Sequence, residues 1–296
     1  IFLQPWYLDG VCEWSCLVLK EGDYPIGILP YFEKRRFGMQ YITMPPFVKH
    51  LGIHLAPTHR ILKKQHQAVQ TLITHLPKND GFKQNFSPYV TNWLPFYWQG
   101  FKQTTLYTYR LNELEDLKAT YNGFNRNMKR NIKKASTQLT VLEDLAPERF
   151  YEINQKSFDR QQIGMPYTLK QFLKHDRSLA EQQARKIFYA LDTDENIHAV
   201  AYLIWDQQRS YYHLSGDDPQ FRNSGAGILL VWHAIQYTAQ KLKLNCFDFE
   251  GSMIPNIEHI RLQFGATQTP YFFIWKHHTL RYKGLDTLQQ WRKRNQ

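Results

Sequence analysis

The first hundred residues alternate between short apolar runs and turn-forming residues. The runs "CLVLK" and "YPIGILPYFEK" flank the turn "EGDYP", and "QYITM" follows them. Apolar runs separated by such turns predict a hairpin meander. Further on, the spacing changes to that of a helix beginning near Thr58, with apolar positions at Ile61, Leu62, Val69, Leu72, Ile73 and Leu76. We therefore expect one amphipathic helix packed on a small sheet.

The second half of the chain also alternates between predicted strands and helices, over more residues. Helical patterns at about 147–157 and 168–184 precede the strand-like runs "KIFYALD", "IHAVAYLIW" and "SYYHLSG", joined by short polar connections. A glycine loop, a helix at about 226–243, the strand "NCFDFEG", a short helix and the strand "YFFIWK" follow. This order predicts an α/β chain of the α+β type, built as two similar units whose mixed, mainly antiparallel sheets are flanked by helices. We place the boundary near residue 105, which gives units 1–105 and 106–296.

Composition agrees with a globular chain of two domains. The 296 residues are 43% hydrophobic and 21% charged. Cys12, Cys16 and Cys246 are too few for a disulfide framework and complete no zinc site, so we expect a reducing compartment and no metal. No apolar run approaches the roughly 20 residues of a membrane span, and "IFLQPWYLDG" lacks the order of a signal peptide, so we expect a cytoplasmic protein. The sequence does not begin with Met, which leaves open a segment upstream of it.

The net charge of +11 favours phosphate-bearing partners such as nucleotides, tRNA or anionic lipid surfaces, or else a merely soluble basic surface. We expect no DNA partner. Much of the charge lies in "FNRNMKRNIKKAS", where helical spacing separates an apolar face from a cationic one. The apolar face holds Phe124, Met128, Ile132 and Ala135, and the cationic face holds Arg126, Arg130, Lys133 and Lys134. The cationic face is either solvated or a ridge that contacts phosphates.

The stretch "FRNSGAGILL" has the spacing R-x-x-G-x-G between a predicted strand and a predicted helix. Backbone amides at the start of a helix lack partners, and glycine lets an anion approach them closely. The loop is either a phosphate cradle or an ordinary turn. No Gly-Lys-Ser/Thr follows, and the preceding strands are predicted antiparallel, so Walker and Rossmann loops are excluded. The candidate anion-binding residues are Arg222, Asn223, Ser224, Gly225, Ala226 and Gly227.

This loop in this setting resembles the signature Gln/Arg-x-x-Gly-x-Gly/Ala of the GNAT acyltransferases, with Arg222, Gly225 and Gly227 as the matching positions. The resemblance implies binding of the pyrophosphate of acyl-coenzyme A. Two further stretches, "FDFEGSMIPNIEHIRLQFGA" and "NRNMKRNIKKAS", resemble the FemABX-like and BioF2-like (CelD-like) branch, whose chains hold two GNAT-type units. Together they cover most of residues 110–276.

Acyl transfer to an amine needs a base for the incoming ammonium and groups that stabilise negative charge. Asp248 and Glu250 alternate on "FDFEG" and are expected to face the same side. Glu250 is either the base or an ordinary solvated or paired carboxylate, and Asp248 is expected to have such a structural role. His213 in "SYYHLSG" is either an alternative base or a packed core residue. Simple GNAT enzymes usually carry a Tyr four residues before the closing Gly, and Fem-like chains often carry a Lys near it, but this chain has Arg261. Arginine stabilises an anion and donates a proton poorly.

Three classes of function therefore follow from the sequence. The first is an N-acyltransferase with acyl-coenzyme A as donor and an amine acceptor, either a small molecule or a cell-wall or glycan precursor. The second is an aminoacyl-tRNA-dependent transferase of the Fem type that acts on a peptidoglycan precursor. The third is a non-catalytic protein that binds polyanions.

Overall fold

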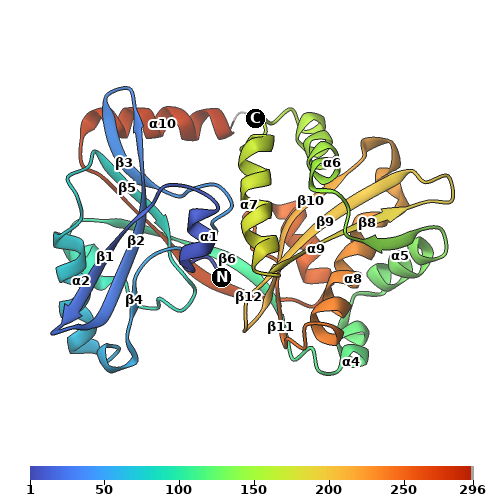
Figure 1. Ribbon diagram of the computed structural model, residues 1–296, viewed down its shortest axis with the longest axis horizontal. Coiled ribbons are helices and arrows are strands. Elements are labelled where there is room, and N and C mark those ends of the chain that lie inside the picture. Colours follow the sequence, from blue (N-terminus) through green and yellow to red (C-terminus); the bar gives the residue numbers. More distant parts are fainter. Residues whose placement is uncertain (295–296) are drawn as a thin grey trace. The chain divides into compact units, whose positions relative to one another are not determined.

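A computed structural model describes residues 1–294, with side chains up to residue 291, and the chain divides into two compact units (Figure 1). Unit 1 comprises Tyr107–Thr269 together with Ile1, and unit 2 comprises Phe2–Leu106 and the segment that begins at Pro270. The first boundary lies next to the predicted one near residue 105. The structure differs from the predicted division after Thr269, because the last segment groups with the first half of the chain.

The sheet of unit 1 has the strand order β6-β11-β10-β9-β8-β7. Neighbours from β7 to β10 are antiparallel, β10 and β11 are parallel, and β11 and β6 are antiparallel. The strands are β6 (Lys102–Asn112), β7 (Thr140–Glu143), β8 (Arg185–Leu191), β9 (Ile197–Trp205), β10 (Ser210–Asp217) and β11 (Cys246–Asp248). The three predicted strands of the second half are confirmed as β8, β9 and β10.

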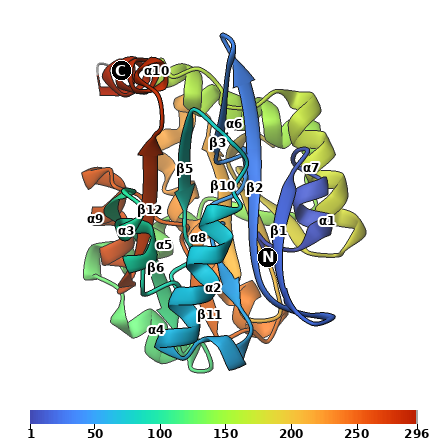
Figure 2. The ribbon, with the colours of Figure 1, turned by 90° about the vertical axis from the view of Figure 1, so that its left-hand side faces the viewer.

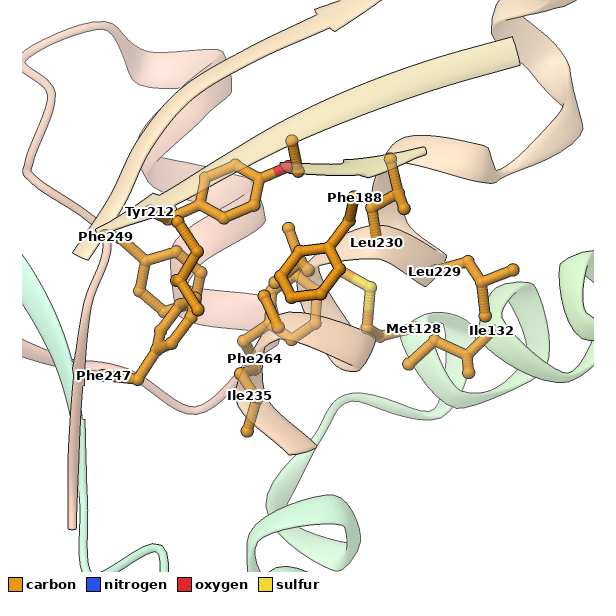
Figure 3. Close-up of a cluster of buried hydrophobic side chains, with 14 of the residues drawn as sticks. Met128, Ile132, Phe188, Tyr212, Leu229, Leu230, Ile235, Phe247, Phe249 and Phe264 are labelled. Carbon is orange, nitrogen blue, oxygen red and sulfur yellow. The ribbon is translucent and has the colours of Figure 1, made fainter. Parts of the chain in front are cut away.

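Helices cover both faces of this sheet. They are α4 (Leu117–Gly123), α5 (Arg126–Ser136), α6 (Pro147–Arg160), α7 (Leu169–Glu181), α8 (Ala226–Gln240) and α9 (Pro255–Gln263). Strand β9 is buried along nearly its whole length, because alternate side chains pack on opposite faces. Ala201 and its neighbours at alternate positions join the core beneath α5 and α8, whereas the Tyr202 ring packs on Phe150 of α6 and Phe172 of α7. Figure 3 shows part of the first core, where side chains of α5 and α8 meet those of the strands.

Unit 2 has the strand order β1-β2-β3-β5-β12, with the short β4 paired to β2 (Figure 2). Its strands are β1 (Ser15–Glu21), β2 (Tyr24–Arg36), β3 (Met39–Thr43), β4 (His54–Leu55), β5 (Gly81–Asn85) and β12 (Thr267–His277). Its α-helices within the described residues are α1 (Pro5–Asp9), α2 (Leu62–Thr74), α3 (Leu94–Trp98) and α10 (Leu280–Arg294). The predicted helix after the meander is α2, which begins after Ile61, while Thr58 lies in a separate short 3-10 turn.

The two sheets share one pattern of pairing. In each, an antiparallel meander leads through a helix, α8 or α2, to a strand parallel to the last strand of the meander. That strand then pairs antiparallel with β6 in unit 1 or β12 in unit 2. Because β12 pairs with β5, the chain returns to unit 2 after Thr269, which explains why the last segment belongs there. The predicted fold class, two GNAT-like units with mixed and mainly antiparallel sheets, is confirmed.

Candidate functional site

The glycine loop forms the entry to helix α8. The short 3-10 helix η2 (Pro219–Ser224) carries Arg222 and Asn223, and Gly225 follows it with a φ of 82°. This left-handed backbone is easily adopted by glycine and turns the chain directly into α8. Within residues 1–294, the amides of Gly227 and Ile228 donate no hydrogen bond, whereas the Ala226 amide donates to Ser224 Oγ at 3.3 Å. The first turn of a 15-residue helix thus presents open amides.

Gly225 is also close to α5. A Cβ on Gly225 would lie 3.3 Å from Ala135 Cβ and 3.6 Å from the carbonyl oxygen of Asn131. In contrast, a Cβ on Gly227 would meet nothing within 4 Å, and Gly227 is exposed. The first glycine therefore serves the backbone turn and the close approach to α5, and the second leaves the space above the open amides clear.

Arg222 lies just before these open amides in the chain, and its side chain is weakly held. Its side chain is 62% exposed, and its Nε lies 4.0 Å from Asp217 Oδ2. An ion pair at that distance and exposure contributes little to stability, so the guanidinium can reorient toward an anion at small cost.

The basic segment folds as predicted. Phe124, Met128, Ile132 and Ala135 are all buried in the core of unit 1. Opposite them, the surface of α4 and α5 is hollowed over a volume of about 660 Å³, which is lined by Tyr121, Arg126, Asn127, Lys129, Arg130 and Lys133. Of the four predicted cations, Arg126, Arg130 and Lys133 line this basic hollow and Lys134 does not. No carboxylate lines it, so its potential is positive.

A second group of predicted residues meets where two parallel strands diverge. Strands β10 and β11 pair only at Ser210↔Phe247 and Tyr211↔Asp248. Beyond this point, β10 has a register shift against β9 at His213, and β11 ends at Asp248. Ligand sites of α/β sheets lie at the carboxyl ends of parallel strands, which is where this divergence occurs.

Glu250, His213 and His175 form a buried chain at this place. His213 Nδ1 lies 2.7 Å from Glu250 Oε1, and His213 Nε2 lies 3.2 Å from His175 Nε2. All three residues are buried. Two facing imidazole nitrogens form a hydrogen bond only if one of them carries the proton, so the protonation states of the two rings are coupled. Burial, followed by the proximity of His213, holds the pKa of His175 well below its ordinary value of 6.5.

His175 was not predicted from the sequence, because it lies on α7 far along the chain from its partner. Its position is fixed by the next residue, since Asp176 accepts a hydrogen bond from the Tyr202 hydroxyl at 2.7 Å and pairs with Arg185 at 2.9 Å. These two contacts tie α7 to β9 and β8. They hold His175 toward His213.

Asp248 pairs with a cation, which is one of the structural roles expected for it, and also supports Glu250. Its Oδ2 accepts from Arg110 Nε at 2.7 Å, and its Oδ1 accepts from Thr108 Oγ1 at 2.5 Å and from the Glu250 amide at 2.8 Å. The expectation that Asp248 and Glu250 alternate along one strand was wrong. The strand ends at Asp248, and Glu250 follows in a left-handed conformation with a φ of 58°, which is strained for a residue with a side chain.

Arg261 on α9 lies close to the same group. Its guanidinium lies 4.7 Å from the centre of the Phe249 ring and 5.8 Å from that of Tyr212. Burial lowers the pKa of Arg261, while the proximity of Tyr212 and Glu250 raises it. The structure therefore gathers the three predicted catalytic residues in one region. Tyr212, a fourth member that the sequence did not indicate, is buried, and burial raises its pKa to about 12.

Two further observations concern residues 1–294. No cluster of three or more His, Cys, Asp or Glu side chains in this part of the chain is arranged to hold a metal ion. In the same range, no helix combines the length and the hydrophobicity needed to cross a membrane.

Residues 122–256 match the family model of the acetyltransferase (GNAT) domain. That range contains the glycine loop, the Glu250 chain and the residues that line the basic hollow, except Tyr121. No curated protein matches the sequence.

Several solved structures have the same fold. FemX is similar with a TM-score of 0.66 and 11% identity over 93% of this chain and 90% of its own. The C-terminal domain of a putative lysylphosphatidylglycerol synthetase from Agrobacterium fabrum has a TM-score of 0.57 and 10% identity over 93% of this chain and 86% of its own. A tandem GNAT protein from the clavulanic acid biosynthesis pathway has a TM-score of 0.53 and 9% identity over 89% of this chain and 82% of its own. Residues 122–256 therefore match a GNAT-type domain, and the chain shares the fold of FemX and of the tandem GNAT protein.

Proposed function

We propose that the protein transfers an acyl group from acyl-coenzyme A to an amine acceptor, with the donor pyrophosphate bound at the start of α8. The observation that carries this proposal is the pair of open amides of Gly227 and Ile228 beside the exposed Arg222. Two amides, a helix dipole and one mobile guanidinium are the elements that bind a diphosphate. The match of this segment to the GNAT family model supports the same assignment.

The chain of Glu250, His213 and His175 is the base of the proposed reaction. The acceptor arrives as an ammonium group and must lose a proton before its lone pair attacks the thioester carbonyl. Glu250, hydrogen-bonded to His213 at 2.7 Å, receives that proton, and the coupled imidazoles share it. The carbon–sulfur bond then breaks as the amide forms, and the thiolate takes up the second proton that the nitrogen loses in this step. The first proton, held by Glu250 and the imidazoles, is released to solvent. Arg261, which keeps its charge, stabilises negative charge during transfer.

The acceptor is an amine on a small molecule or on a cell-wall or glycan precursor. This part of the proposal is supported only by the likeness to FemX and to the tandem GNAT protein, whose fold this chain shares.

Calorimetric titration with acetyl-coenzyme A tests the donor site. Arg222→Ala should weaken binding by about 10-fold to 100-fold, because it removes a charge-assisted contact. Gly227→Val should weaken it as well while the fold persists, since the new side chain enters open space above the amides. Arg149→Ala is the matched control, because Arg149 is a similarly exposed arginine of unit 1 that pairs with Glu152 on its own helix. If the wild type releases no heat at millimolar ligand, the loop is a structural turn.

The basic hollow favours a second candidate, an aminoacyl-tRNA donor. Arg126, Lys129, Arg130 and Lys133 place four cations around one concave surface beside the Tyr121 ring, an arrangement suited to phosphates and a stacked base. Charge reversal at Arg130 and Lys133 should weaken tRNA binding strongly at low salt and less at high salt. Lys134→Glu is the matched control, because Lys134 is on the same helix but outside the hollow. Lys134→Glu reverses one charge and the test variant reverses two, so a control effect half as large on the free-energy scale would show that the helix acts through overall charge alone.

A further inference from the structure

Helix α10 leaves one apolar stripe uncovered. Leu280, Leu288 and Trp291 have exposed fractions of 85%, 47% and 62%. Gly284 and Thr287 lie between them in the sequence. The five positions 280, 284, 287, 288 and 291 have the spacing of residues on one side of a helix. They border a shallow open hollow of about 530 Å³, together with Lys283. An apolar stripe of this kind is a binding surface rather than a scattered set of exposed residues.

The opposite side of α10 fixes the helix to unit 2. The buried Tyr282 ring packs on Tyr41 with 4.9 Å between centroids, and it occupies the space that a side chain on Gly81 would need. Asp286 is buried and pairs with Lys83 of β5 and with His277 of β12, the latter at 2.8 Å. These contacts fix the orientation of α10 on unit 2, so the apolar stripe is held on the exposed side of the helix.

The docking also determines the charge of the exposed side. Asp286 is the only acidic residue in the sequence of α10, and its carboxylate is turned inward and neutralised by Lys83. Arg281 and Lys283 are exposed beside the stripe, and the sequence of the helix ends with Arg292, Lys293 and Arg294. The outward side of α10 thus combines cations with leucine and tryptophan and presents no carboxylate.

We propose that this outward face of α10 binds the surface of an anionic lipid membrane. An interfacial helix buries its apolar side chains at the level of the headgroups while its cations contact lipid phosphates. Tryptophan is favoured at that depth, and arginine and lysine reach the headgroups from the flanks. A soluble polyanion would need the cations alone, but it would not cover Leu280, Leu288 and Trp291. The proposal rests on unit 2 alone and does not depend on the donor or the acceptor proposed for unit 1.

Co-sedimentation of the whole chain with two kinds of vesicle tests this proposal. Vesicles of phosphatidylcholine with phosphatidylglycerol should bind the protein, and vesicles of phosphatidylcholine alone should bind it at least about tenfold more weakly. The double variant Leu288→Ser/Trp291→Ser should lose most of the binding to anionic vesicles, because it removes the apolar contact. Arg281→Glu/Lys283→Glu should lose a similar share at low salt and a smaller share at high salt.

A matched control uses another exposed apolar pair of unit 2. Ile61 and Leu62 at the start of α2 are 68% and 59% exposed, so Ile61→Ser/Leu62→Ser removes a similar apolar area from a different helix. Vesicle binding should stay at the wild-type level in this variant, and far-ultraviolet circular dichroism should be the same in all variants. Wild-type protein that fails to bind anionic vesicles at low salt would overturn the proposal.

Two other outcomes would also overturn it and name a different partner of the stripe. If sedimentation velocity shows a dimer that Leu288→Ser/Trp291→Ser dissociates, the stripe is an interface between two copies of the chain. If vesicle binding survives the α10 changes and is lost on charge reversal at Arg130 and Lys133, the basic hollow is the lipid-binding surface.

Discussion

Each unit contains a buried carboxylate that is hydrogen-bonded to a histidine, and the two pairs have different surroundings. In unit 2, Asp286 lies 2.8 Å from His277 and also binds Lys83 and Gln290, so its partners come from β12, β5 and α10. In unit 1, Glu250 lies 2.7 Å from His213 and stands after the end of a strand, on a left-handed backbone supported by Asp248. The first pair, Asp286 with His277, holds α10 against the sheet of unit 2. The second is held in a strained position at the ends of parallel strands.

Both carboxylates are buried beside a histidine, so these two features are not enough to identify a catalytic base. Asp286 sits in ordinary helical backbone, and its cationic partner compensates its charge locally. Strained backbone at Glu250 costs about 1–3 kcal/mol and persists only where the surrounding structure maintains it, which is typical of functional positions. The changes below are designed to separate the two roles, in order of decreasing effect.

The largest expected effect is that of Glu250→Gln on acyl transfer. The amide keeps the shape of the side chain but cannot accept a proton from the acceptor amine, so kcat should fall by about 100-fold to 10,000-fold. Affinity for acetyl-coenzyme A should change little, because the proposed donor site is at the start of α8. Steady-state kinetics with calorimetry separates the two quantities. A fall in stability with unchanged kcat would make Glu250 a counterpart of Asp286.

The next largest effect is that of Asp286→Asn on stability. The change leaves Lys83 partly buried without its counter-charge, so the unfolding free energy of unit 2 should fall by about 3 kcal/mol. We expect normal kcat at temperatures where the variant is folded. Thermal unfolding followed by calorimetry, with kinetics below the transition, measures both. Loss of kcat in the folded variant would contradict the division of roles between the two pairs.

The sequence predicted the elements around both pairs better than the pairs themselves. Helical spacing identified the buried face of α5, and the R-x-x-G-x-G pattern identified the loop before α8, because such features are local. His175 was missed because its contact with His213 depends on how α7 packs against the sheet. The sequence also did not predict that the segment after Thr269 belongs to unit 2. The reason is similar, since β12 pairs with β5 in the first half of the chain. Periodicity contains no information about such long-range pairing.

A moderate effect is expected from acid, through the buried His175 of unit 1 and the half-buried His54 of unit 2. Burial lowers the pKa of His175 in unit 1, and burial with nearby Arg60 lowers the pKa of His54 in unit 2 to about 4. A lowered folded-state pKa means that these residues stabilise the fold fully above pH 6.5, and that this contribution is lost as the pH falls toward the folded-state pKa. Stability should therefore decrease between pH 6.5 and pH 4, by about 3 kcal/mol or less from His54 alone.

Denaturant titrations across that range should show which histidine is responsible. His54→Gln should flatten the pH dependence of unit 2, and His175→Gln should flatten that of unit 1. If one of these changes removed the pH dependence of stability in both units, the two units would not respond to acid separately.

The smallest effect compares two helical glycines, Gly227 of α8 and Gly284 of α10. A Cβ at either position would meet nothing within 4 Å, and both lie within helices. Alanine at either site should raise the unfolding free energy by about 0.5–1 kcal/mol, because alanine loses less backbone entropy in a helix. Donor affinity should stay unchanged in Gly227→Ala, because the GNAT signature accepts alanine at this position. Valine separates the two sites: Gly227→Val should weaken the binding of acetyl-coenzyme A, since its branched side chain would stand over the open amides, and Gly284→Val should not. Thermal unfolding and calorimetric titration of these variants measure the differences. Equal donor affinity in the two valine variants would mean that the amides of Gly227 and Ile228 do not contact the donor, so that the glycine loop would serve only to turn the chain into α8.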